Sequence, residues 1–190
     1  GFDPRQDAVW MAEAYPESTR VWVSQPRIAI FLSAMRHFAA TCRARDWPVH
    51  YRELSQSPPS ATLAQLLAQD LATLRPAQVV WVEPGEWALR EALRTVAGEP
   101  EGGEWNFDSE NRKSFGRAGP EGLIAPRRFP PDGITARVID DVRRVFGAHP
   151  GALDDFDWPV TAAVAVLALA DFIEQRLPRF VDLQVEIWRG

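Results

Sequence analysis

The residue types that carry out chemistry are few and widely spaced in this chain. Cys42 is the only cysteine among 190 residues, so neither an internal disulfide nor a metal cluster held by several cysteines can form within one chain. Its place in a helical pattern favours a buried structural side chain. His37, His50 and His149 lack the spacing of metal ligands, and there is no phosphate-binding glycine loop or nucleophile–histidine pair. The sequence therefore indicates no metal site and no catalytic residue.

Two carboxylates occupy positions just beyond expected strands, where parallel sheets bind their ligands. Glu17 follows the expected strand 8–13, and Glu83 opens the loop after the expected strand 78–82. The alternative for Glu17 is an ordinary solvated side chain in a loop. The alternative for Glu83 is that its loop is a tight turn whose tryptophan, Trp87, covers the core.

An alternating order of strands and helices positions these carboxylates. Short apolar runs predict strands, and the run QVVWV is typical of a strand buried on both faces. The expected strands are 8–13, 49–54 and 78–82. Apolar residues at helical spacing predict helices near 26–46, 61–74 and 86–97. Ser60 or Thr62 is a candidate cap for the second helix. This order predicts an α/β fold with a parallel sheet covered by helices.

Composition and charge are those of a soluble globular protein. Hydrophobic residues make up 46% and charged residues 25% of the chain, and the formal net charge of −5 gives no support to nucleic-acid binding by this chain alone. No run reaches the roughly 18 apolar residues of a membrane span, and the polar start lacks a signal-peptide pattern. We expect a cytoplasmic protein without a membrane partner, and the oligomeric state is left open.

The pattern changes after Gly98. Residues 99–133 are rich in proline and glycine, which is typical of a crossing between domains. An amphipathic helix is expected at 134–147 and a long helix at 160–177. The segment 112–128 is locally basic, and its cations either contact DNA phosphates or pair with neighbouring carboxylates. They are Arg112, Lys113, Arg117, Arg127 and Arg128.

Five sequence blocks, in order along the chain, resemble one protein family. They are QPRIAIFLSAMRHFA (25–39), VEPGEW (82–87), GGEWNFDSENRK (102–113), FPPDGITARVIDDV (129–142), and GALDDFDWPVT with DFIEQRLPRF (151–161 and 171–180). GGEWNFDSENRK is the most specific. Together the blocks resemble the bacterial iron–sulfur photolyase/cryptochrome family, the deoxyribodipyrimidine photolyase-related proteins of the prokaryotic (6-4) photolyase group.

The resemblance implies a domain order. Residues 1–98 would form a Rossmann-like antenna domain, 99–133 an interdomain crossing loop, and 134–190 the first helices of an α-helical catalytic domain. In the family the antenna domain holds 6,7-dimethyl-8-ribityllumazine, while the catalytic domain holds FAD and a 4Fe-4S cluster and acts on damaged DNA. The complete protein would perform light-dependent DNA repair or blue-light photoreception. This chain would bind at most the lumazine and would be inactive alone. The alternative is a non-enzymatic α/β ligand-binding or interaction domain.

The resemblance also bears on the candidate site residues. Glu17 matches a family carboxylate that contacts the lumazine. Phe31 stands where the family has a smaller aliphatic residue, so its ring either stacks on the chromophore or fills its space. Glu83 joins them as part of a ligand-facing loop. The basic, histidine-containing approach of the family is WVSQ (22–25) here.

The chain departs from the family pattern in three places. The resemblance implies a strand with a Gly-Asp-Gln-type loop ahead of Gly1, and a further strand and helical segment between Gly98 and Glu104. It also implies flavin-binding helices and cluster cysteines beyond Gly190. Two explanations fit: a longer protein of which this is a part, or a shortened gene.

Overall fold

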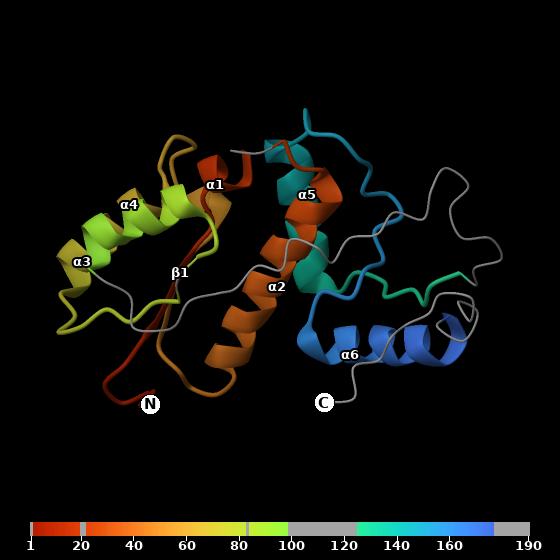
Figure 1. Cartoon of the computed structure of the whole chain (residues 1–190), viewed down its shortest axis with the longest axis horizontal. Helices are drawn as coiled ribbons and strands as arrows, with labels where there is room; N and C mark the ends of the chain where they lie inside the picture. The colour runs from red at the N-terminus through yellow and green to blue at the C-terminus, as the bar shows by residue number, and fades with distance from the viewer. Residues whose placement is uncertain (1, 20–21, 83, 99–124, 177–190) are drawn as a thin grey trace. The chain divides into compact units, whose positions relative to one another are not determined.

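The computed structural model describes residues 2–19, 22–82, 84–98 and 125–176 (Figure 1). These fall into two compact units. Unit 1 comprises Gly1–Val23 and Ala39–Asn111, and unit 2 comprises Ser24–Phe38 and Arg112–Gly190. The helix α2 (Gln25–Arg43) contributes its first part to unit 2 and its last turns to unit 1. The predicted α/β fold followed by helices is confirmed.

Unit 1 contains a parallel pair of strands, β1 (Val9–Ala12) and β2 (Val49–Arg52). Val9 lies opposite Val49 and Ala12 opposite Arg52. A parallel pair needs a long crossover connection, and α2 lies in that connection. Two of the three predicted strands are thus confirmed, as is their parallel pairing.

The prediction of a third strand at 78–82 is wrong. This segment forms no ladder with any described residue, and Val80 and Val82 are 67% and 80% exposed. The apolar run has the composition of a buried strand, but a strand also requires a hydrogen-bonding partner along its edge. The structure offers it none among the described residues.

The helices of unit 1 begin and end where their capping residues predict. In α3 (Leu63–Leu74), the Thr62 side chain accepts the Gln65 amide while Gln65 accepts the Thr62 amide. The helix ends at Arg75, whose φ of 46° is left-handed. α4 (Trp87–Ala97) ends at Gly98, whose φ of 82° suits a glycine. Sequence analysis did not predict α1 (Tyr15–Thr19) or the 3-10 turn η1 (Leu54–Gln56).

The core of unit 1 is built around Trp10. Its ring packs on one cluster of buried side chains at Ala12, Ala14, Ala61 and Leu66, and on a second at Ala64, Leu67 and Leu93. The second cluster joins α3 to α4, which lie side by side (Figure 1). The even-numbered side chains of β1 therefore face α3 and α4.

Asp70 of α3 holds the two strands together. It accepts hydrogen bonds from Trp10 Nε1 of β1 at 2.7 Å and from Arg52 Nε of β2 at 2.8 Å. The Arg52 guanidinium, aided by Trp10, keeps the pKa of the Asp70 carboxyl below its usual range, although partial burial acts in the opposite direction. The carboxylate is therefore stabilised in its charged form by groups from both strands.

Unit 2 has its own core around α5 (Gly133–Val145). Val138 and Val142 are fully buried, together with Phe146, Leu153 and Phe156. α6 (Ala162–Asp171) has no buried residue, and it continues into a π-helical turn, η2 (Phe172–Arg176). No helix among the described residues is long and apolar enough to cross a membrane.

Polar contacts join the first part of α2 to α5. Arg36 is buried and donates to Asp141 at 2.7 Å. Burial alone would raise the pKa of Asp141, but bonds from Arg36 and Arg144 outweigh it and lower the pKa. Gly151 lies against Pro26 with a φ of 94°, and an added Cβ would come within 2.8 Å of the proline ring. Glycine is therefore required where this loop meets α2.

The Asp70 contacts predict a pH-dependent contribution to stability. Because the folded-state pKa of Asp70 is lowered, its contribution is present above the unfolded pKa of about 3.9 and is lost as pH falls through the folded value. Replacing Asp70 by Asn should lower the free energy of unfolding at pH 7 by about 1–3 kcal/mol. Urea unfolding at pH 7, 5 and 3 should show that difference shrinking toward pH 3. A difference independent of pH would contradict the assignment.

Candidate functional site

The carboxyl ends of β1 and β2 bring together acidic side chains, and the most buried of them is Glu13. Only 1% of Glu13 is exposed. Its Oε1 accepts the Tyr51 hydroxyl at 2.6 Å, and its Oε2 accepts the Leu54 amide at 2.9 Å. Glu13 thus fixes the end of β2 and the start of η1 against β1. Sequence analysis missed it, although a charged residue directly after an apolar strand was a usable signal.

Glu17 lies in the first turn of α1, directly after β1, and not in a loop. Its Oε1 accepts the Leu63 amide, the first of α3, at 3.2 Å. That amide has no acceptor within its own helix, so the carboxylate complements the helix amino terminus. The position at the carboxyl edge of the strands is as predicted, and the carboxylate also has a structural role there.

Phe31 lies on α2 with 60% of its surface exposed, in the part of the helix that belongs to unit 2. Glu17 belongs to unit 1. Ile28 and Leu32, on neighbouring positions of the same helix, are buried. The exposed ring offers a flat apolar surface.

Glu83 lies outside the described residues, so its predicted role as a ligand contact stays a prediction. The loop that follows it leads into α4, whose N-cap Glu86 makes no side-chain capping bond. Trp87 is 69% exposed. The alternative in which this tryptophan covers the core is therefore wrong.

Two residues of the basic segment, Arg127 and Arg128, are described. Arg127 pairs with Asp171 at 3.6 Å, and Arg128 pairs with Asp157 at 3.3 Å. These two ion pairs support the alternative in which the cations of the segment pair with carboxylates. The partners, Asp157 and Asp171, lie farther along the chain than the segment itself. Arg112, Lys113 and Arg117 lie outside the described residues.

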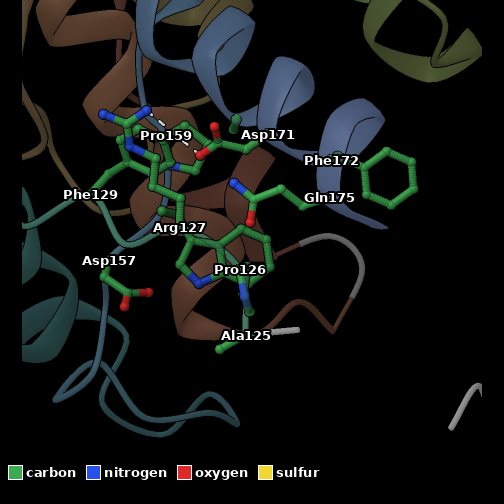
Figure 2. A pocket seen from close by; sticks show the side chains of 11 residues that line it. Ala125, Pro126, Arg127, Phe129, Asp157, Pro159, Asp171, Phe172 and Gln175 are labelled. Carbon is green, nitrogen blue, oxygen red and sulfur yellow. Dashed lines mark ion pairs between the residues drawn. The ribbon is translucent and has the colours of Figure 1, made fainter. Parts of the chain in front are cut away.

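A cavity of about 370 Å³ lies in unit 2 beside this segment (Figure 2). Its wall combines aromatic and proline rings with the Arg127–Asp171 pair; the rings are those of Phe129, Trp158, Phe172, Pro126 and Pro159. Such walls accommodate a flat apolar group. Neither Glu17 nor Phe31 lines this cavity.

The side chains of the described residues suit one cofactor of the family, the ribityl-lumazine, and do not suit another, the iron–sulfur cluster. Within the described residues, no group of three or more His, Cys, Asp or Glu side chains is placed to hold a metal ion. A four-iron cluster is normally held by four thiolates, and Cys42, the chain's single cysteine, is buried. The residues therefore do not fit that cluster. Glu17 at the strand ends does suit the hydroxyl groups of a ribityl chain, because a carboxylate accepts hydrogen bonds from hydroxyls.

These features define an α/β unit with a parallel pair of strands that is acidic at its carboxyl edge, and a second unit that is helical. The sequence profile of the deoxyribodipyrimidine photo-lyase-related protein family matches residues 1–99 and 95–158. The chain belongs to this family.

A curated relative, the (6-4) photolyase of Agrobacterium fabrum, is 28% identical over 233 residues. The match takes in 95% of this chain and 45% of the relative, so the chain spans less than half of that protein's length. The aligned length exceeds the 190 residues of this chain. The relative therefore carries residues inside the match that have no counterpart here.

Glu13 gives a stability prediction for this edge of the sheet. Replacing Glu13 by Ala should remove the carboxylate that accepts from the Tyr51 hydroxyl and from the buried Leu54 amide, and the loss of the buried acceptor alone should cost about 1–3 kcal/mol. Chemical unfolding of the purified chain measures this loss. Replacing Glu91, whose carboxylate is half-exposed and pairs with Arg94, by Ala should change the free energy of unfolding by less than about 1 kcal/mol. Equal effects of the two replacements would contradict the assignment.

Proposed function

We propose that this chain is the antenna domain and adjoining helices of a protein that, when complete, performs light-dependent DNA repair or blue-light photoreception. The observation that carries the proposal is the family match across residues 1–158. In this proposal the chain binds a ribityl-lumazine, which absorbs light and passes the excitation to a flavin held elsewhere in the complete protein. Damaged DNA is the partner of the complete protein.

The position of Glu17 supports the binding part of the proposal. It follows β1 directly, at the edge where parallel sheets take their ligands. Glu17 would accept hydrogen bonds from ribityl hydroxyls, and the Phe31 ring would offer an apolar face to the bicyclic part of the chromophore. Glu83 would contribute from the loop ahead of α4. Glu13 would hold the strand ends in place without touching the ligand.

One observation favours the second candidate, a non-enzymatic α/β ligand-binding or interaction domain. Glu13 and Glu17 both accept amide protons from the protein itself, at Leu54 and Leu63. Carboxylates used in this way stabilise a scaffold whether or not a chromophore binds. The absorption spectrum separates the two candidates, because a bound lumazine absorbs at about 420 nm or below and a bound flavin adds a band at about 450 nm.

Titration with 6,7-dimethyl-8-ribityllumazine tests the role of Glu17. The change Glu17→Ala should leave ribityl hydroxyls unpaired and weaken binding by about 5- to 150-fold, equivalent to about 1–3 kcal/mol. Glu17→Gln keeps an acceptor for the Leu63 amide and removes the charge, so it separates loss of ligand contact from loss of the helix contact. Glu91→Ala is the control and should bind as the unchanged chain does.

The same titration tests Phe31. Replacing Phe31 by Ile should weaken binding if the ring stacks on the chromophore, and strengthen it if the ring occupies the space of the ligand. Unchanged affinity in both the Glu17 and Phe31 variants, or no binding at all, would overturn the antenna proposal. The second candidate, a non-enzymatic α/β domain, would then remain.

Metal and flavin content test whether the iron–sulfur cluster and the flavin are held outside this chain, in the rest of the complete protein. Purified as these 190 residues, the chain should contain less than one iron atom per molecule, because one cysteine cannot supply four thiolates. It should contain no stoichiometric flavin, because the family resemblance implies flavin-binding helices beyond Gly190. Iron analysis and the visible spectrum measure both. Several irons per chain would refute the expectation.

A further inference from the structure

The cavity of unit 2 combines walls made of flat rings with a polar end. Phe129, Trp158 and Phe172 supply aromatic rings, and Pro126 and Pro159 supply saturated ones. Its volume of about 370 Å³ lies at the lower end of the range for small-molecule sites. The cavity therefore has room for a small ring system, whose faces would lie against the rings of the wall.

The polar end of the cavity is formed by Arg127, Asp171 and Gln175. Figure 2 shows the Asp171 carboxylate between the Arg127 guanidinium and the Gln175 amide. Asp171 and Gln175 are four positions apart where α6 continues into η2, so the two side chains lie on the same side of this helix. The polar end thus presents an acceptor, the carboxylate, flanked by a guanidinium donor and by an amide that can donate.

The arginine and the aspartate of the polar end retain the capacity to bond a third group. They form an ion pair at 3.6 Å, which is longer than a hydrogen bond between a guanidinium and a carboxylate. The Arg127 guanidinium also lies over the Phe129 ring, 5.5 Å from its centre. A ligand that bonds to Arg127 and Asp171 together therefore replaces no close hydrogen bond between them.

The charges of the cavity balance one another. Its second carboxylate, Asp157, pairs with Arg128 at 3.3 Å, while Asp171 pairs with Arg127. Because each carboxylate has an arginine of its own, the field in the cavity favours neither an anion such as phosphate nor a cation. A neutral ligand is the one that this balance suits.

We propose that the cavity binds a neutral planar heterocycle through a cyclic imide edge, in which an N–H group lies between two carbonyl groups. The imide N–H donates to Asp171, and the flanking carbonyls accept from Arg127 and Gln175. The faces of the ring stack on the aromatic wall, including Trp158. Uracil-type and pteridine-type rings share this edge, whereas cytosine places an acceptor where Asp171 requires a donor. The proposal does not rest on the antenna proposal, because neither Glu17 nor Phe31 lines the cavity.

Equilibrium dialysis of the purified chain against thymidine tests the imide edge. Thymidine should bind with a Kd of about 1 mM or tighter. N3-methylthymidine, in which a methyl group replaces the imide hydrogen, should bind at least about tenfold more weakly, because Asp171 then faces no donor. Both ligands are measured on the unchanged protein, so the comparison does not depend on the folding of a variant. Equal affinity for the two nucleosides, or no binding of thymidine, would overturn the proposal.

Variants locate the binding. Asp171→Ala removes the acceptor, so it should weaken thymidine binding at least about tenfold and abolish the preference over N3-methylthymidine. Asp140→Ala is the matched control, since Asp140 is an exposed aspartate of α5 that pairs with Arg143 at 3.9 Å, and it should bind thymidine as the unchanged chain does. Trp158→Leu should weaken both nucleosides equally, and Trp158→Phe should restore most of the affinity. A preference that survives in Asp171→Ala would contradict the assignment.

Competition distinguishes the two ring types that carry the edge. 6,7-Dimethyl-8-ribityllumazine is added to the chain with thymidine bound. Displacement of thymidine, together with weaker lumazine binding in Asp171→Ala, would support a pteridine-type ring as the occupant of the cavity. Thymidine that stays bound would support a uracil-type ring. The effect of Glu17→Ala on lumazine binding reports separately on the antenna proposal, so either proposal can fail without the other.

Discussion

The carboxylate of Asp70 joins α3 to both strands of the sheet, and the remaining order of unit 1 depends on it. Each strand has four residues, and an isolated pair that short is marginal in water. Asp70 binds Trp10 and Arg52 through charged or indole donors, which are stronger than the neutral bonds of the ladder. Because Trp10 also packs on α3 and α4, the same contact sets the helix layer against the sheet and places the strand ends where Glu13 and Glu17 lie.

Much of the fold follows from local sequence. Helical spacing and caps such as Thr62 and Asp132 act within a few residues of themselves, so α2, α3, α4 and α5 were predictable. Segment 78–82 shows the limit of this reasoning, since its composition predicts a strand and a strand exists only where another backbone meets it. The five-residue helix α1 was missed because a single turn and a half has no periodicity to detect.

A site residue could be predicted from the sequence when its position follows from the order of strands and helices. It could not be predicted when its role depends on hydrogen-bond partners far away in the sequence. Glu17 was found because residues after a parallel strand lie at its ligand edge. Glu13 was missed because its role depends on Tyr51 and Leu54, which are 38 and 41 positions away in the sequence. Phe31 shares a helix with Ile28 and Leu32 but is exposed beside them, since a residue at the margin of an apolar face is buried only if a neighbour covers that margin.

One continuous helix, α2, contributes residues to both units. Its first part is bonded to α5 through Arg36 and Asp141, and its last turns bring Ala39 and Cys42 into the interior of unit 1. A helix propagates residue by residue once it has nucleated, so loss of order at one end shortens the segment that stabilises the other.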